Sequence, residues 1–238
     1  MKSFVVAGLH GDEVFGLKIL GILDRSDSDN ITTKVGHAEA IAKKKRFIES
    51  DLNRSFGRGV TTLESEVASI LSKNISVSNP DYIIDIHTSR SDVRVVAIVS
   101  LLTETNIYLA HELNAEAIVI MPSHLTETSL IGCMPDRSIS LEFGANQRSD
   151  KLAIKTAQAI QGLTGITVVK NNLPIYAVIA KIPKSYKGLK GIKNLVLDED
   201  LGGYPFLAGM NTYPDFGGFL AKKMGKDTSD NNLVYNGE

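Results

Sequence analysis

The sequence predicts an α/β fold followed by a smaller β-rich domain. Over the first part of the chain, short apolar runs rich in β-branched residues alternate with segments of helical spacing, a pattern typical of an α/β sheet domain. After Gly165 the runs are short and β-rich, and prolines and glycines interrupt them. We therefore expect a main domain over residues 1–164 and a small β domain over 165–238.

Three apolar runs are predicted to be buried strands of the main domain. They are Ser3–Ala7, Tyr82–Ile86 and Ser138–Leu141, and polar residues follow each run directly. Their length and composition are typical of strands buried on both faces. The polar residues indicate functional loops at the ends of these strands.

Three segments have helical spacing, two between these runs and one after the third run. They are Glu13–Leu23, Thr61–Leu71 and Lys151–Leu163. In the small domain the expected strands are Ile166–Val169, Ile175–Ile182 and Leu195–Leu197.

Composition limits the function classes. The chain has 238 residues, and its 26 basic and 27 acidic side chains give no net field that would attract nucleic acid or an acidic membrane. The single cysteine, Cys133, excludes a disulfide framework. No apolar run is long enough for a signal peptide or a membrane span, so we expect a cytoplasmic protein.

The first candidate site motif is His10-Gly11-Asp12-Glu13, which follows the first predicted strand. His10 and Glu13 are three residues apart and can face one point as the loop enters a helix. An imidazole and a carboxylate suit Zn²⁺, which would need a third ligand from elsewhere and leave a position for water. A helix cap or an exposed pair is the alternative.

The second motif is Asp85-Ile86-His87, at the end of the second predicted strand. Open α/β sheets gather functional groups at such strand ends. Asp85 and His87 alternate along the strand and share a face, so the carboxylate can orient the imidazole. A histidine that bonds a nearby Ser or Thr is the structural alternative.

The third motif, Arg46 to Arg54, contains side chains that bind carboxylates and carbonyls. Arg46 and Arg54 present planar forks of donors that suit carboxylates, and Asn53 adds a neutral donor.

The fourth motif places Glu142 directly after the third predicted strand. Glu142 needs a partner if it is buried, which a metal-bound water or a salt bridge could provide.

In this order, the motifs H-G-D-E, R-x-x-x-x-D-L-N-R, D-I-H-T and L-E-F-G resemble the aspartoacylase and succinylglutamate desuccinylase family, relatives of the zinc carboxypeptidases. The resemblance implies a mixed central sheet flanked by helices. It also implies that His10, Glu13 and His87 bind one zinc ion per chain, and that Glu142 is the general base and acid.

The resemblance assigns the remaining roles to residues that contact the substrate. Arg46 would polarise the scissile carbonyl, and Asn53 and Arg54 would bind the α-carboxylate of an N-acyl amino acid. Tyr204-Pro205 followed by Tyr213 resembles the C-terminal segment that brings a tyrosine to the substrate. A homodimer is expected at the level of the family.

One family feature has no clear counterpart. The arginine that binds a side-chain carboxylate of the substrate is not evident, since Arg137 lies closer to Glu142 than expected. Hydrolysis of an N-acyl amino acid is the first hypothesis. A carboxypeptidase-like hydrolase of short peptides and a non-catalytic relative of the fold are the alternatives.

Overall fold

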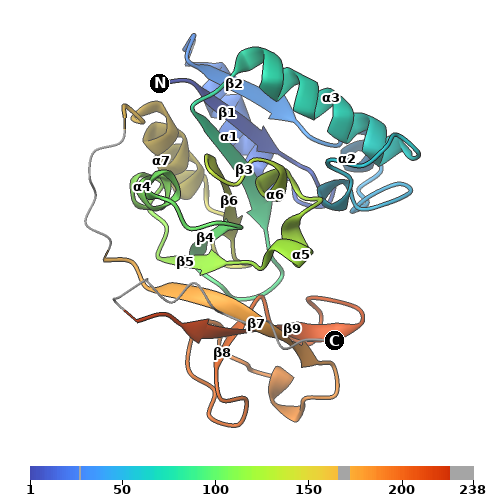
Figure 1. Ribbon diagram of the computed structural model, residues 1–238, viewed down its shortest axis with the longest axis vertical. Helices are drawn as coiled ribbons and strands as arrows, with labels where there is room; N and C mark the ends of the chain where they lie inside the picture. Colours follow the sequence, from blue (N-terminus) through green and yellow to red (C-terminus); the bar gives the residue numbers. More distant parts are fainter. Residues whose placement is uncertain (27, 166–171, 226–238) are drawn as a thin grey trace.

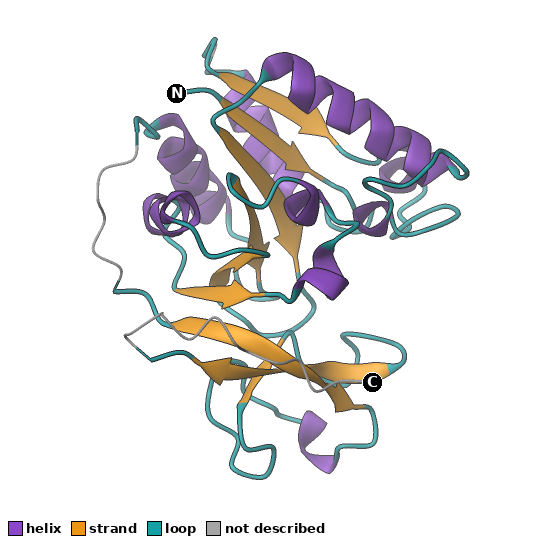
Figure 2. Cartoon of the chain, viewed as in Figure 1, coloured by secondary structure: helices purple, strands orange, loops and turns teal. Residues whose placement is uncertain are grey.

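The protein, described by a computed structural model over residues 1–26, 28–165 and 172–225, is built on one nine-stranded sheet within those ranges. Helices pack against this sheet, and the C-terminal strands extend it (Figures 1 and 2). The strands are β1 Ser3–Ala7, β2 Ile31–Val35, β3 Tyr82–Thr88, β4 Val95–Val99, β5 Ala117–Ile120, β6 Ser138–Phe143, β7 Ile175–Pro183, β8 Tyr204–Phe206 and β9 Phe216–Lys223. The helices are α1 Phe15–Asp24, α2 Ala38–Ala42, α3 Leu63–Ser78, α4 Glu104–Glu112, α5 Ser123–Thr126, α6 Leu130–Cys133 and α7 Asp150–Gln161, with short 3-10 helices η1 Leu52–Arg54 and η2 Lys187–Leu189.

The sheet is mixed, which confirms the predicted fold class. Its strand order is β2-β1-β3-β6-β4-β5-β7-β9-β8. β2, β1, β3 and β6 run parallel, whereas β4 is antiparallel to β6. Because β1, β3 and β6 run in the same direction, their carboxyl ends meet at one edge of the sheet.

Helices α1, α4 and α7 cover one face of the sheet and form its largest hydrophobic cluster. On the opposite face, α3 packs over β1 and β3 in a second cluster that includes Phe4, Ile83 and Ile75. A third cluster lies farther along this face, on β4, β5, β7 and β9. The part of the face between the second and third clusters carries polar side chains.

The predicted strands of the main domain match β1, β3 and β6 closely, and the three predicted helices correspond to α1, α3 and α7. The strand expected at Ile175–Ile182 is β7, while the one expected at Ile166–Val169 lies outside the described residues. None of the described helices is both long and apolar enough to cross a bilayer.

The strand expected at Leu195–Leu197 is wrong. This segment is a loop in which Leu195 has a left-handed φ of 58°. The Asn194 side chain holds the loop by bonding both the N–H and the C=O of Ala208. Those polar bonds take the place of a strand ladder.

The C-terminal strands are joined to the main sheet by backbone pairing. β7 runs parallel to β5, with Val119 opposite Tyr176, and β9 and β8 continue outward from β7. Figure 1 shows these strands below the helical part of the molecule. The division at residues 164 and 165 stays a prediction.

Candidate metal centre and active-site cleft

Three parallel strands bring the predicted chemical groups to one place. His10 and Glu13 lie in the loop between β1 and α1, His87 lies near the end of β3, and Glu142 lies near the end of β6. His87 is directly opposite Glu142 in the β3–β6 register. All four residues are buried, with at most 8% of their surface exposed.

His10, Glu13 and His87 form a compact cluster. Glu13 Oε1 lies 2.7 Å from His10 Nδ1, and Glu13 Oε2 lies 3.0 Å from His87 Nδ1. One potential ligand atom from each of the three residues falls within 4.8 Å of the others. These three groups can therefore face a common point.

Two carboxylates behind the cluster orient the imidazoles. Asp51 Oδ1 lies 3.0 Å from His10 Nε2, and Asp85 Oδ2 lies 2.7 Å from His87 Nε2. Each imidazole thus has a carboxylate oxygen beside both of its ring nitrogens. With a metal ion in the cluster, Asp51 and Asp85 would hold a proton on Nε2 and leave Nδ1 free as a ligand atom. Two imidazole nitrogens and one carboxylate, with space for water, are the ligand set of a catalytic zinc ion, so the residues fit zinc.

The charged groups of the cluster shift one another's pKa values. Burial works against charge on all three groups. Glu13 and Asp51 nevertheless raise the pKa of His10. In the same way, Asp85 and Glu13 raise the pKa of His87 well above its ordinary value. The two imidazoles in turn lower the pKa of Glu13 well below its usual range. Negative charge that stabilises protons on imidazoles would equally attract a divalent cation.

Glu142 lies beside this cluster, and its pKa is shifted in the opposite direction to that of Glu13. Within the described residues its carboxylate makes no hydrogen bond or ion pair, so neither Arg137 nor Arg148 provides the salt bridge that was its structural alternative. Burial, and then the negative charge of Glu13, raise the pKa of Glu142 to about 7. A carboxyl group with this pKa can both accept and donate a proton near neutral pH.

The segment before and through η1 supplies the remaining polar groups. Asp51 caps η1 by accepting from the backbone N–H of Asn53 at 2.9 Å. The Asn53 side chain accepts from the backbone N–H of Leu130 at 3.1 Å and lies 3.3 Å from His87 Nε2. Arg54 is exposed and donates to the carbonyl of Asn53 at 2.6 Å.

Arg46 reaches the cluster from the same segment. Its guanidinium lies 3.3 Å from both Glu13 Oε1 and Asp51 Oδ2 while its side chain stays 44% exposed. The carboxylate of Asp51 therefore serves the His10 imidazole and the Arg46 guanidinium together. The sequence pattern does not identify Asp51 as a site residue, although Asp51 belongs to the polar D-L-N-R stretch.

Tyr213 enters the site from the loop between β8 and β9. Its ring stacks on Phe216 with centroids 4.2 Å apart and packs edge-on against Phe219. Burial raises the pKa of the Tyr213 hydroxyl, so it stays protonated at neutral pH and can act as a donor.

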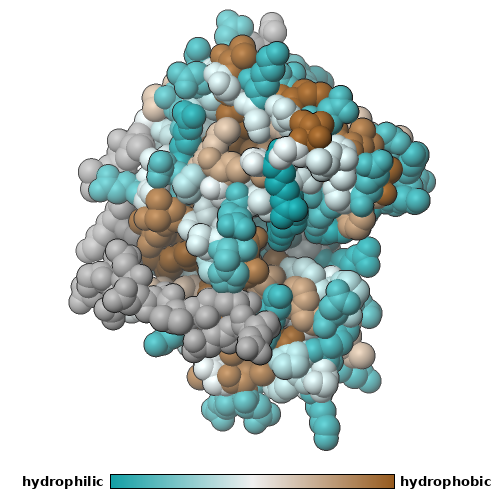
Figure 3. Space-filling model, turned by 45° about the vertical axis from the view of Figure 1, so that its right-hand side comes forward, coloured by the Kyte–Doolittle hydropathy of each residue, from teal (hydrophilic) through white to brown (hydrophobic). Residues whose placement is uncertain are grey.

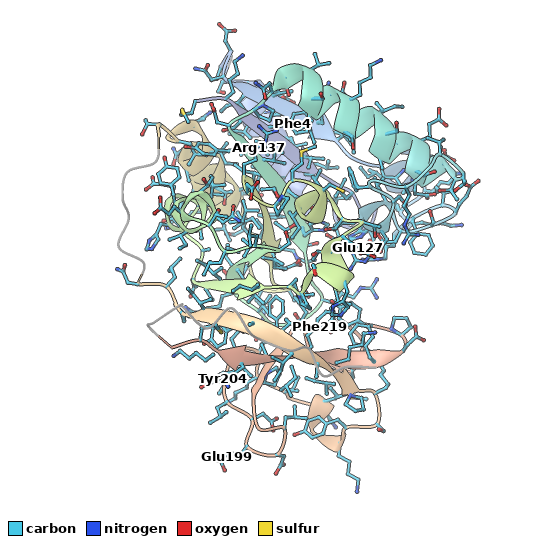
Figure 4. The ribbon with its side chains drawn as sticks, viewed as in Figure 1. Phe4, Glu127, Arg137, Glu199, Tyr204 and Phe219 are labelled. Atoms are coloured by element: carbon cyan, nitrogen blue, oxygen red, sulfur yellow. The ribbon has the colours of Figure 1, made fainter. Side chains whose placement is uncertain are left out.

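All eight predicted site residues line one cleft of about 1210 Å³. A notch in the space-filling view separates the helical part of the molecule from the strands below it (Figure 3), and the cleft draws its lining from both parts. Arg137 is not among the lining residues. It donates to the carbonyl of Pro80 at the amino end of the strands, near Phe4 and far from Phe219 (Figure 4).

The fold and the cleft define an α/β protein with a candidate metal centre at the carboxyl edge of a mixed sheet. The chain belongs to the succinylglutamate desuccinylase/aspartoacylase catalytic domain family, whose profile matches residues 1–163. Membership of this family indicates a deacylase that acts on N-acyl amino acids. Among curated proteins no relative matches.

Solved structures share this fold at low sequence identity. The succinylglutamate desuccinylase from Chromobacterium violaceum matches with a TM-score of 0.72 and 18% identity, over 94% of this chain and 85% of that one. Murine aminoacylase 3 matches with a TM-score of 0.67 and 16% identity, over 94% and 95%. The ectoine utilization protein EutE (DoeB) from Ruegeria pomeroyi, in a product-bound structure, matches with a TM-score of 0.56 and 16% identity, over 93% and 78%.

Proposed function

We propose that this protein is a zinc-dependent hydrolase that cleaves the amide bond of an N-acyl amino acid. One observation carries the proposal: Glu142, buried and without a partner among the described residues, lies beside the His10–Glu13–His87 cluster in the same cleft. A binding protein has no need of a buried carboxylate without a partner, because its burial costs free energy. A hydrolase needs such a group to move protons.

His10, Glu13 and His87 would hold the zinc ion. When bound, zinc would supply a Lewis acid and lower the pKa of water toward ~7. The carboxylates of Asp51 and Asp85 would keep both imidazoles in the tautomer that this role requires.

Glu142 would transfer the proton in both halves of the reaction. Its carboxylate takes a proton from the attacking water, and the carboxylic acid then gives that proton to the nitrogen of the departing amine. The pKa of about 7 suits both directions, since the group changes protonation state close to neutral pH.

Arg46 would stabilise the negative charge that develops on the carbonyl oxygen. Its guanidinium already reaches the cluster, and its position is held by Asp51 and Glu13. A donor fixed before the reaction lowers the barrier because it needs no reorganisation as the charge develops.

Asn53, Arg54 and Tyr213 would bind the substrate. Arg54 is exposed in the cleft and can pair with a carboxylate through two parallel hydrogen bonds. Tyr213 can donate from its protonated hydroxyl on the opposite side. A cytoplasmic location and a homodimer remain predictions of the sequence.

The first test is the metal content of the purified protein by elemental analysis, with His10→Ala as the variant. We expect about one zinc per chain, lost in His10→Ala, and hydrolysis of at least one compound in a panel of N-acetyl and N-succinyl amino acids. Absence of zinc after reconstitution would refute the metal centre. Cleavage of dipeptides without cleavage of any acyl amino acid would favour the carboxypeptidase alternative.

A further inference from the structure

The face of the sheet that carries Glu142 changes from polar to apolar within one strand. In the β6–β4 register, Glu142 lies opposite Val96 and Ser140 lies opposite Ile98. Neighbouring strands are about 4.8 Å apart, and paired residues project from the same face. A substituent attached to an amide beside Glu142 would therefore reach the side chains of β4.

Of the β4 side chains, Ile98 is part of a continuous apolar surface in the cleft, here called the apolar wall. It consists of Ile98, Met121, Leu125, Ile131, Leu207 and Phe219, all of which line the cleft. All six belong to one hydrophobic cluster or pack against it, and they come from both sides of the cleft. Figure 4 shows Phe219 on the side of the C-terminal strands.

The wall exposes little surface, and what it exposes faces the cleft. Ile98, Met121 and Leu207 are each between 6% and 8% exposed, and Leu125 is half-buried. Burial of a ligand group against this surface would remove the remaining apolar area from water. The lining is therefore typical of the apolar part of a small-molecule site.

Four further cations of the cleft each contact another residue of its lining, and of these contacts one is to a carboxylate. Arg90 pairs with Asp12 at 3.3 Å, and Lys184 donates to the carbonyls of Met210 and Tyr213 at 2.5 Å each. Arg148 donates to the carbonyl of Ser89. Lys181 stands 5.5 Å from the centroid of the Phe216 ring.

Arg46 and Arg54 are the cations that the proposed function already uses. Lys181 lies at one side of the wall, since the Phe216 ring that it contacts packs edge-on against Phe219. A carboxylate placed against the wall away from Lys181 would lose hydration without gaining a partner, which is unfavourable. An acidic second substituent on the substrate is thus disfavoured over that part of the wall.

We propose that the substrate carries an apolar group, aliphatic or aromatic, that packs against the apolar wall. This inference rests on the proposed function and specifies its substrate class. The group is either the acyl chain or the side chain of the amino acid, because both are attached close to the scissile amide. The α-carboxylate would remain with Asn53 and Arg54.

Two series of substrates, assayed with the zinc-loaded protein, distinguish an apolar acyl chain from an apolar amino-acid side chain. The first varies the acyl group on glycine through acetyl, butanoyl, hexanoyl, benzoyl and succinyl. The second varies the amino acid of N-acetyl derivatives through glycine, leucine, phenylalanine and aspartate. We expect kcat/KM to rise by about 10-fold or more from the smallest to the larger apolar member of one series, as for a filled hydrophobic pocket.

The series that rises identifies which end of the substrate the wall contacts. Equal rates throughout both series, or a preference for succinyl or aspartate, would overturn the inference. If no compound is hydrolysed, the proposed function fails. The affinities of the same compounds for the zinc-loaded protein, measured by calorimetry, then test whether the wall prefers apolar groups. Tighter binding of the apolar members supports the inference, and equal or tighter binding of the acidic members overturns it.

Met121→Ala and Leu125→Ser test the wall itself. We expect each variant to reduce the ratio of kcat/KM for the larger apolar compound to that for the smallest compound by about 5-fold or more. This ratio does not depend on the fraction of folded protein. Leu152→Ala, a partly buried leucine on α7 outside the cleft, is the matched control and should leave the ratio unchanged. An unchanged ratio in both wall variants would contradict the assignment.

Discussion

The carboxylate of Glu64 lies 3.0 Å from Nε2 of His37, and both side chains are almost completely buried. The same carboxylate accepts hydrogen bonds from three consecutive backbone N–H groups, those of Ile48, Glu49 and Ser50. The Glu64 carboxylate thus contacts the backbone of the segment between Arg46 and Asn53. The pair therefore holds this segment in place, although neither His37 nor Glu64 lines the cleft.

The first prediction concerns pH-dependent stability through Glu64. Burial opposes its ionisation, but hydrogen bonds from His37 and from backbone N–H groups outweigh burial and lower the pKa of Glu64 to about 2. A carboxyl with a depressed pKa stabilises the folded state above its unfolded pKa of ~4.3, and this contribution is lost as pH falls toward the folded value.

Glu64→Gln should therefore reduce the free energy of unfolding at pH 7 by about 2 kcal/mol. It should also flatten the loss of stability as the pH falls from about 4.3 to about 2. Urea denaturation at several pH values measures both effects. Glu66→Gln, exposed on the same helix, is the control, and an equal effect in both variants would show that buried hydrogen bonding is not the cause.

The second prediction separates proton transfer from metal binding. Glu142→Gln should retain zinc and lower kcat by about 10²-fold to 10⁴-fold, because the amide cannot accept a proton from water. His87→Ala should lose both zinc and activity. Elemental analysis and steady-state kinetics on the two variants measure the difference, and equal metal loss in both would place Glu142 among the ligands.

The third prediction concerns Asp51, which orients His10. Asp51→Asn should weaken zinc affinity by about 10-fold to 100-fold, since an amide cannot accept from the imidazole as strongly as a carboxylate. Competition with a zinc chelator measures the affinity. Asp12→Asn removes a nearby charge that pairs with Arg90 instead, and it should change the affinity little. Comparable losses in the two variants would point to a general charge effect.

The fourth prediction concerns recognition of the α-carboxylate. Arg54→Ala should raise KM for substrates with a free α-carboxylate much more than for their carboxamides, because only the carboxylate pairs with two guanidinium N–H groups. Arg58→Ala, exposed nearby but outside the cleft, should affect neither. If Arg54→Ala impairs both substrate types equally, another residue binds the carboxylate.

The sequence predicted the parts of the site that belong to single strand ends. His10, His87 and Glu142 each follow or end an apolar run, and parallel strands bring such ends together whatever the intervening segments do. The Asp85–His87 contact could be predicted because residues two apart on a strand share a face.

Other relationships depend on tertiary packing and could not be predicted. The histidine partners of Asp51 and Glu64 lie 41 and 27 residues away in the chain, so no local pattern identifies them. The edge strand β2 is half-exposed and lacks the apolar run of a buried strand. β4 is apolar, but its direction relative to β6 is not encoded in its composition.

The backbone pairing of β5 with β7 also determines how the cleft can change shape. The two sides are joined by a backbone hydrogen-bond ladder between Ile118–Ile120 and Ile175–Ala177. A flexible linker would allow the sides to rotate, whereas this ladder does not. Opening the cleft as two rigid halves would break these hydrogen bonds, so its width is set when the sheet forms. Rotamer changes in residues such as Met121, whose unbranched side chain adapts readily, can then accommodate a larger acyl amino acid without breaking the ladder.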